Sequence, residues 1–203
     1  MVSSSRRRSS QEKRLQAIWK LAVDSVGCEA GPTVEFEAKV MVEGLKQIRE
    51  SLGEIEGKIQ EICSSFPEYE YLLSIPGFGP DVASKVLGAV GNPYRFQNGR
   101  QVLKLAGFDL CAKRSGKSSE NVVPVISRRG KADLRNGLYQ AALIASIKNP
   151  GFIAYYTAKL RGREREPGIR YKMRVKLASK LLLIAWTLMK KKESYNPDHL
   201  VTE

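Results

Sequence analysis

The sequence predicts a mainly α-helical protein, in which a long N-terminal helical segment precedes a compact, basic helical domain. Apolar residues recur at helical spacing along most of the chain, and a strict heptad pattern runs through residues 34–62. Only residues 107–128 combine glycines, serines and β-branched residues, which indicates either one short hairpin or an ordered loop. The 203 residues, 42% of them hydrophobic, suffice for one ordinary domain with an extension.

Four parts follow from this pattern. Residues 1–10 are rich in Ser and Arg and are expected to be a disordered basic tail. Residues 11–66 form a helical and coiled-coil linker or dimerisation segment, with a first amphipathic helix over 11–26. Residues 67–192 form the compact domain, and residues 193–203 form a tail. Helices of the compact domain are expected at 80–90, 98–106, 131–147, 151–161 and 169–191.

The heptad stripe is the most regular feature of the chain. Its apolar positions alternate in steps of four and three, which is the spacing of a coiled-coil seam. Two interpretations are open: the stripe pairs with another chain, or it belongs to a long helix packed against its own domain. The stripe consists of Val34, Ala38, Met41, Leu45, Ile48, Leu52, Ile55, Ile59 and Ile62.

Positive charge dominates the composition and is unevenly placed. The chain holds 34 Lys and Arg against 21 Asp and Glu, a formal net charge of +13. Residues 35–70 are acidic, whereas residues 95–135 and 159–192 are strongly basic. Such a basic half predicts a polyanionic partner, most commonly nucleic acid, although a basic housekeeping protein would show the same balance.

Cysteine and histidine usage argues against a metal site in this chain. Cys28, Cys63 and Cys111 lie far apart, no CxxC pair exists, and His199 is the only histidine. The N-terminus reads as a charged helix and not as an apolar leader, and no apolar run is long enough to span a bilayer. We therefore expect a cytoplasmic protein without a membrane partner.

The segment Ile75-Pro76-Gly77-Phe78-Gly79 lies between two expected helices and resembles a helix-hairpin-helix. Glycines at 77 and 79 would allow a tight turn whose N–H groups approach a DNA phosphate, and the following helix would add its positive N-terminal end and Lys85. Such a turn holds the DNA backbone without reading sequence. The alternative is a glycine turn between two packed helices.

A second basic segment places Ser115 among the cations Lys113, Arg114 and Lys117. These cations would stabilise the charge that develops on an attacked phosphodiester, so Ser115 is a candidate nucleophile. They cannot remove the serine proton, and no histidine is near in sequence. From the residues alone, a basic loop without chemistry is the competing interpretation.

A third basic segment precedes the helix expected at 131–147. Cations at the start of a helix oppose its dipole, and an anionic partner relieves that cost. The segment is therefore predicted to be a phosphate-binding turn. Its candidate DNA-binding residues are Ser127, Arg128, Arg129, Lys131 and Arg135.

Together these segments resemble the C-terminal domain of the insertion-sequence "one-ten" family of transposases, the bridge-RNA-guided serine recombinases. The resemblance covers about residues 70–192, and the preceding heptad stripe is similar to the linker between that family's two domains. The order of the motifs is more specific than any one of them. The motifs are Ile75–Gly79, Lys104–Phe108, Arg114–Lys117, Ile126–Gly130, and Leu134-Arg135 with Leu138 and Ala141-Ala142.

The resemblance implies roles that the residues alone do not. It implies that Ser115, directly before Gly-Lys, attacks DNA and becomes covalently linked to it. It also implies an N-terminal RuvC-like domain that binds magnesium through four acidic residues, a guide RNA, and dimers that pair into tetramers. Each active site would combine a serine domain with the RuvC-like domain of another protomer.

This sequence departs from the family pattern in two places. The proline that many relatives carry shortly after the Ala-Gly-Leu element is missing after Gly107-Phe108. The 203 residues begin in a helical segment, so we expect a truncated chain that lacks the RuvC-like domain. We therefore expect the DNA-binding, serine-bearing half of a transposase, inactive without a RuvC-like domain and needing magnesium only with that domain. The alternative is a non-catalytic, dimeric helix-hairpin-helix module that only binds nucleic acid.

Overall fold

The computed structural model describes residues 2–25, 31–111 and 125–200. These residues form eight α-helices and one two-stranded sheet, which confirms the mainly α-helical fold. The chain divides into two compact units, residues 1–52 and residues 53–203, and the boundary falls within one helix. Each unit is described by itself.

The first unit holds helix α1 (Val2–Val23) and the first part of helix α2 (Pro32–Ser64). Helix α1 includes residues 2–10, which the sequence analysis expected to be disordered, and it ends before residue 26. The difference has a physical reason: Arg is a good helix former, Ser costs only a few tenths of a kcal/mol, and residues 2–23 contain neither Gly nor Pro. Composition alone therefore underestimated the helix.

Helix α2 carries the heptad stripe, whose large side chains are all exposed. Met41 is 72% exposed, Ile48 59% and Ile55 52%. No stripe position is buried among the described residues. Both interpretations of the stripe stay predictions, because each of the two units is described by itself. The stripe leaves an apolar surface along α2 that a partner helix could cover.

The second unit begins at Gly53, earlier than the domain start at residue 67 expected from the sequence. The last turn of α2 belongs to the core because Cys63 is buried in the same cluster as Tyr69 and Leu87. Pro67 follows the end of α2 and occupies the first turn of the next helix. Its missing N–H does not destabilise that helix, because the first N–H groups of a helix have no intrahelical acceptor. The helices that follow are α3 (Pro67–Leu73), α4 (Pro80–Val90), α5 (Gly99–Ala106), α6 (Ala132–Lys148), α7 (Pro150–Leu160) and α8 (Ile169–Lys191).

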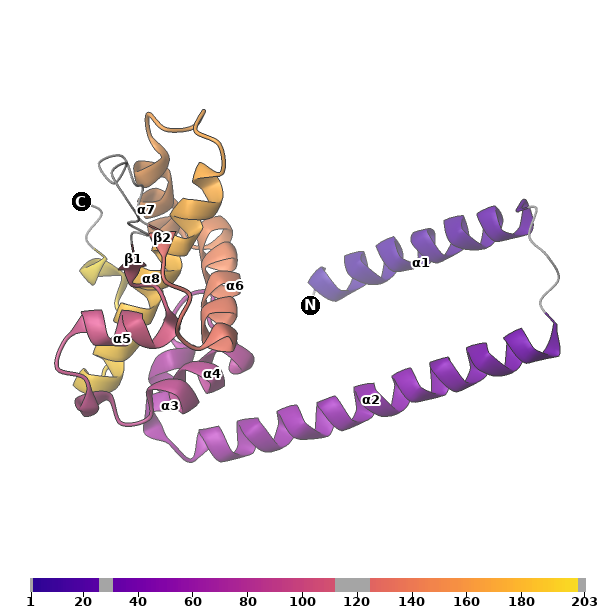
Figure 1. Ribbon diagram of the computed structural model, residues 1–203, viewed down its shortest axis with the longest axis horizontal. Coiled ribbons are helices and arrows are strands. Elements are labelled where there is room, and N and C mark those ends of the chain that lie inside the picture. The colour runs from indigo at the N-terminus through magenta and orange to yellow at the C-terminus, as the bar shows by residue number, and fades with distance from the viewer. Residues whose placement is uncertain (1, 26–30, 112–124, 201–203) are drawn as a thin grey trace, which may run out of the picture. The chain divides into compact units, whose positions relative to one another are not determined.

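Helix α8 is the centre of this unit. It packs against α3, α4, α5, α6 and α7, and Figure 1 shows it running among them. Leu177, Leu181 and Leu182 have no exposed surface, and Trp186 donates a 2.8 Å hydrogen bond to the carbonyl oxygen of Pro93, which fixes the loop after α4. The buried face of α8 is the surface against which the other helices are positioned.

A short hairpin interrupts the helices. Strand β1 (Leu110–Cys111) pairs with strand β2 (Val125–Ile126) in antiparallel register, with Leu110 opposite Ile126 and Cys111 opposite Val125. The hairpin, rather than a loop without pairing, is therefore present at residues 107–128. It connects α5 to α6.

The C-terminal segment folds back onto the domain. The ring of Tyr195 stacks on Phe152 with 5.7 Å between centroids, and its backbone N–H donates a 2.8 Å hydrogen bond to Oγ of Ser74. A short 3-10 helix, η3 (Pro197–His199), follows. The described part of the expected tail is therefore docked. Across the described ranges, no helix has the length and apolar character needed to cross a membrane.

Candidate nucleic-acid interface

The base of the hairpin is tied by residues on either side of it. Oγ of Ser127 donates a 2.5 Å hydrogen bond to Oδ1 of Asp109, and the Ser127 backbone N–H donates to the Asp109 carbonyl oxygen at 2.7 Å. The two residues are 18 positions apart in sequence. A hydrogen bond to a charged group is stronger than one between neutral groups, so this pair fixes where the segment after β2 begins. Ser127, predicted to contact DNA, is engaged in this bond.

Two glycines allow the turn after β2 to lie against the end of α5. A Cβ on Gly130 would lie 2.3 Å from both the Gly107 nitrogen and the Leu105 carbonyl oxygen. Gly107 itself has φ +69, where side chains are disfavoured. Backbone bonds from Arg128 to Gly107 (3.1 Å) and from Lys131 to Leu105 (2.8 Å) close the contact. The predicted phosphate-binding turn is therefore held rigidly on α5.

Arg135 stabilises this turn from the first part of α6. Its Nη1 donates to the Ala106 carbonyl oxygen at 2.9 Å and approaches the Gly130 carbonyl oxygen at 3.5 Å. The side chain is half-buried. Arg135 was predicted to bind DNA, and the structure gives it a positioning role for the turn.

The other cations of the turn are directed to solvent. Arg128, Arg129 and Lys131 are exposed, and none of them forms a salt bridge with any residue that the structure describes. Arg128 also has φ +56, a left-handed conformation that costs a non-glycine residue about 1–2 kcal/mol. Unpaired, exposed cations on a rigid turn are suited to phosphate groups.

The glycine turn between α3 and α4 has a different environment from the one expected. Gly77 has φ +94, and a Cβ there would lie 2.6 Å from the Ala141 carbonyl oxygen of α6. The glycine thus permits close packing on α6. Near Gly79 there is open space, but Asp81 occupies the first turn of α4 and pairs with Lys85 at 2.7 Å. Lys85, a predicted DNA-binding residue, therefore forms a solvent-exposed ion pair within α4.

The candidate nucleophile lies outside the described residues. Ser115, with Lys113, Arg114 and Lys117, belongs to the segment 112–124 that connects β1 to β2. The two ends of that segment, Cys111 and Val125, are paired in the sheet. The structure therefore fixes where the segment leaves and rejoins the domain.

Beside the turn lies a cavity of about 460 Å³ that the sequence analysis did not identify. Arg128 and Arg135 line it, together with side chains of α6 and α8. One sequence feature points to this cavity. Large polar and aromatic residues follow one face of α6, and small apolar residues follow the opposite face. The large residues are Arg135, Asn136, Tyr139 and Gln140.

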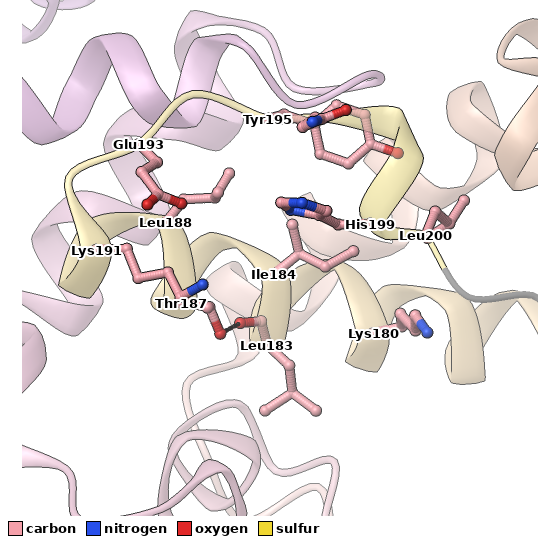
Figure 2. A pocket seen from close by; sticks show the side chains of 11 residues that line it. Lys180, Leu183, Ile184, Thr187, Leu188, Lys191, Glu193, Tyr195, His199 and Leu200 are labelled. Carbon is pink, nitrogen blue, oxygen red and sulfur yellow. Dashed lines mark hydrogen bonds between the residues drawn. The ribbon is translucent and has the colours of Figure 1, made fainter.

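A second cavity, of about 520 Å³, lies between α8 and the C-terminal segment. Figure 2 shows His199 and Tyr195 from the C-terminal segment on one side, with Ile184 and Leu183 of α8 on the other. The Tyr195 hydroxyl is buried and has no hydrogen-bond partner among the described residues. Burial raises the pKa of Tyr195 above the ordinary tyrosine value.

Titratable groups elsewhere do not cluster. Within the described ranges, no three His, Cys, Asp or Glu side chains lie close enough together to hold a metal ion. Cys63 and Cys111 are free thiols, and burial raises the pKa of the Cys63 thiol.

Comparison with known proteins connects this region to mobile DNA. Residues 69–157 match the family described as "Transposase IS116/IS110/IS902 family". The chain is also 27% identical over 148 residues to the "Insertion element IS900 uncharacterized 42 kDa protein" of Mycobacterium paratuberculosis. The alignment covers 72% of this chain and 35% of that relative, so this chain corresponds to only part of it. Both similarities are to proteins of insertion sequences.

Proposed function

We propose that this chain supplies the DNA-binding, serine-nucleophile half of an insertion-sequence transposase. The observation that carries the proposal is the match of residues 69–157 to a transposase family, because this region includes the hairpin, the cationic turn and the first part of α6. The exposed, unpaired Arg128, Arg129 and Lys131 add the chemistry that a DNA backbone requires.

In the proposed reaction, Ser115 is the nucleophile. Its hydroxyl oxygen attacks the phosphorus of a phosphodiester, gives up its proton, and displaces one deoxyribose oxygen. A serine–phosphate ester then links the protein to one DNA end. Lys113, Arg114 and Lys117 stabilise the negative charge on the phosphate while this occurs.

The proton of Ser115 needs an acceptor, because a serine hydroxyl is a weak nucleophile at its ordinary pKa. In the family that the sequence resembles, a RuvC-like domain binds magnesium and completes the active site. The described residues of this chain offer no side-chain cluster that fits magnesium. We propose that a RuvC-like domain provides the activation.

The test is the formation of a covalent adduct. The chain is mixed with the RuvC-like domain of a related transposase, its guide RNA, magnesium and labelled DNA, and adducts are separated on a denaturing gel. We expect an adduct that Ser115→Ala abolishes and that the controls Ser118→Ala and Ser119→Ala retain, whereas the chain alone gives none. An adduct that survives Ser115→Ala would identify a different nucleophile. DNA binding without any adduct would favour the competing function, a binding module.

The proposed assembly is a dimer or a pair of dimers. The exposed heptad stripe of α2 supports it, because an apolar seam in which Ile48 and Ile55 are each more than half exposed is suited to a second helix. A guide RNA is a further proposed partner, since the same exposed cations that bind DNA phosphates also bind those of RNA.

A further inference from the structure

The cavity beside the cationic turn combines three kinds of side chain. Apolar side chains of Phe108, Ile126 and Val175 line it together with two aromatic rings, two amides and two arginines. No carboxylate is among the described residues that line it. A volume of about 460 Å³ lies within the range of about 300–1,000 Å³ typical of pockets that enclose a small organic group.

Aromatic rings from two helices form one wall. Tyr139 of α6 and Tyr171 of α8 lie with their ring centroids 5.3 Å apart and their planes at 44°. Tyr171 is 49% exposed although it also contacts Tyr139. An exposed ring at the edge of a cavity offers a flat surface on which another ring can stack.

Two amides stand on the same side of α6 as Tyr139. Asn136 and Gln140 are four residues apart, so their side chains lie one above the other. Both are exposed, and neither side chain makes a hydrogen bond to any residue in the part of the chain that the structure describes. An amide presents a donor and an acceptor together, which matches the hydrogen-bonding edge of a nucleobase.

The strained residue Arg128 completes the rim. Its left-handed backbone is an observed departure from the conformations that non-glycine residues prefer, and it lies where its guanidinium borders the cavity. Strain of this kind persists where the surrounding structure imposes it, here through the contact between Gly107 and Gly130. A cation at the mouth of a flat, amide-lined cavity is suited to the phosphate attached to a bound base.

We propose that this cavity receives a single unstacked nucleobase of the bound DNA. Tyr171 stacks on the base, Asn136 and Gln140 hydrogen-bond to its edge, and Arg128 holds its phosphate. The inference rests on the proposed function, because it supposes that DNA lies along the cationic turn. It goes further by naming the site at which an unpaired nucleotide is held beside the hairpin.

The chemistry of the cavity favours a nucleobase over an amino acid side chain. Unpaired bases are held by stacking on aromatic residues and by hydrogen bonds to their polar edges, and proteins that act on DNA often hold a nucleotide outside the helical stack. An apolar protein segment would leave both amides without partners. An acidic peptide would use the cations but not the exposed ring of Tyr171.

The test uses the full chain and three DNA duplexes of one sequence: fully paired, with one bulged adenine, and with one bulged abasic site. Affinities are measured by fluorescence anisotropy at several salt concentrations. We expect the bulged adenine to be bound at least about fivefold more tightly than the abasic bulge, the effect of one stacked and hydrogen-bonded base. Equal affinity for the two bulges would overturn the inference.

Variants of the cavity make the test specific. Tyr171→Ala, and separately Asn136→Asp with Gln140→Glu, should reduce the ratio between the two bulges to about one, whereas Tyr171→Phe should preserve it because the ring remains. Gln47→Ala is the matched control, an exposed helical glutamine on α2. A ratio that persists in Tyr171→Ala, or that falls equally in Gln47→Ala, would refute the assignment. Circular dichroism confirms that each variant is folded.

The outcomes separate this inference from the proposed function. Salt-dependent binding of all three duplexes without discrimination between the bulges leaves the proposed function standing and removes the nucleobase site. If none of the duplexes is bound at low salt, the proposed function itself fails.

Discussion

Gly130 lies against Gly107 so closely that a methyl group on Gly130 would overlap the backbone nitrogen of Gly107, at 2.3 Å. The two glycines bring the cationic turn onto the end of α5 and place Arg128 in its left-handed conformation. The rigidity of the candidate interface therefore depends on the absence of two side chains. This relationship connects the stability of the domain to the position of its exposed cations.

The first prediction concerns that contact. Gly130→Ala should lower the free energy of unfolding by about 1–3 kcal/mol, since the added methyl group meets backbone atoms that cannot rotate away. Urea denaturation measures the change. The matched control is Gly79→Ala, where the added Cβ meets open space and the effect should stay within about 0.5 kcal/mol. Equal losses in the two variants would contradict the packing argument.

The second prediction separates stability from binding at one residue. Arg128→Gly should leave the free energy of unfolding unchanged or raise it by up to about 1 kcal/mol, because glycine adopts a positive φ without strain. DNA affinity should nevertheless fall, and the slope of log affinity against log salt should become shallower by ~0.9 for one lost phosphate contact. A salt slope identical to that of the unmodified protein would show that Arg128 does not contact phosphate.

The third prediction concerns the turn as a whole. Arg128→Glu combined with Arg129→Glu should weaken binding to all DNA sequences alike, because phosphate contacts carry no sequence information. Filter binding with several unrelated duplexes measures this. Lys39→Glu with Lys46→Glu changes the net charge equally, but on the acidic helix α2. If this control weakened binding as much, total charge and not the turn would govern affinity.

The fourth prediction concerns assembly. Ile48→Asp with Ile55→Asp should convert a dimer or larger assembly into monomers, because two charges per chain would have to enter an apolar seam. Light scattering coupled to size-exclusion chromatography reports the mass. Gln47→Asp with Gln60→Asp adds the same charge away from the heptad stripe and should preserve the assembly. A monomer in the unmodified protein would exclude pairing through α2.

The fifth prediction concerns alkaline pH. Burial raises the pKa of Tyr195, as it does for Tyr155 and Tyr69, so the folded protein favours the neutral phenol. The resulting stability is present below the unfolded pKa of about 10 and is lost as the pH rises above it. Urea denaturation at about pH 8 and about pH 11 should show this decline, and Tyr195→Phe should make it shallower.

Tyr195→Phe also distinguishes the hydroxyl from the ring. The hydroxyl has no partner among the described residues, so its removal should not cost stability at neutral pH. Tyr195→Ala removes the ring from Phe152 and should cost about 2 kcal/mol. If Tyr195→Phe were as damaging as Tyr195→Ala, a hydrogen bond must be made by this hydroxyl.

The spacing of apolar residues predicted most of the helices of the compact domain, because the residues that each helix buries recur at helical intervals in the sequence. Helix α4 begins and ends where the apolar spacing and Pro80 place it, and α8 spans the predicted residues 169–191. Residues 2–10 have neither apolar spacing nor a proline at a helix start. Only the absence of Gly and Pro indicates that α1 includes them. Apolar spacing was therefore sufficient to predict a helix where the apolar residues are buried in the core.

Tertiary contacts explain what the sequence did not reveal about the site. Tyr139 and Tyr171 are 32 positions apart, and only the packing of α6 on α8 brings their rings together. Gly77 approaches Ala141 of α6, a contact between distant positions that the local sequence does not reveal. The pairing of Lys85 with Asp81 corresponds to a spacing of four residues on one helix, which the sequence already contains.

The pairing of Cys111 with Val125 has a consequence for engineering. Since the segment 112–124 leaves and rejoins the domain at two adjacent, hydrogen-bonded positions, its length and sequence are not constrained by the distance between its ends. The corresponding segment of a related transposase could be grafted between these two residues, with α5, α6 and the turn at Gly130 left unchanged. The hairpin thus acts as an exchange point, at which segments of different sequence can be compared on one constant scaffold.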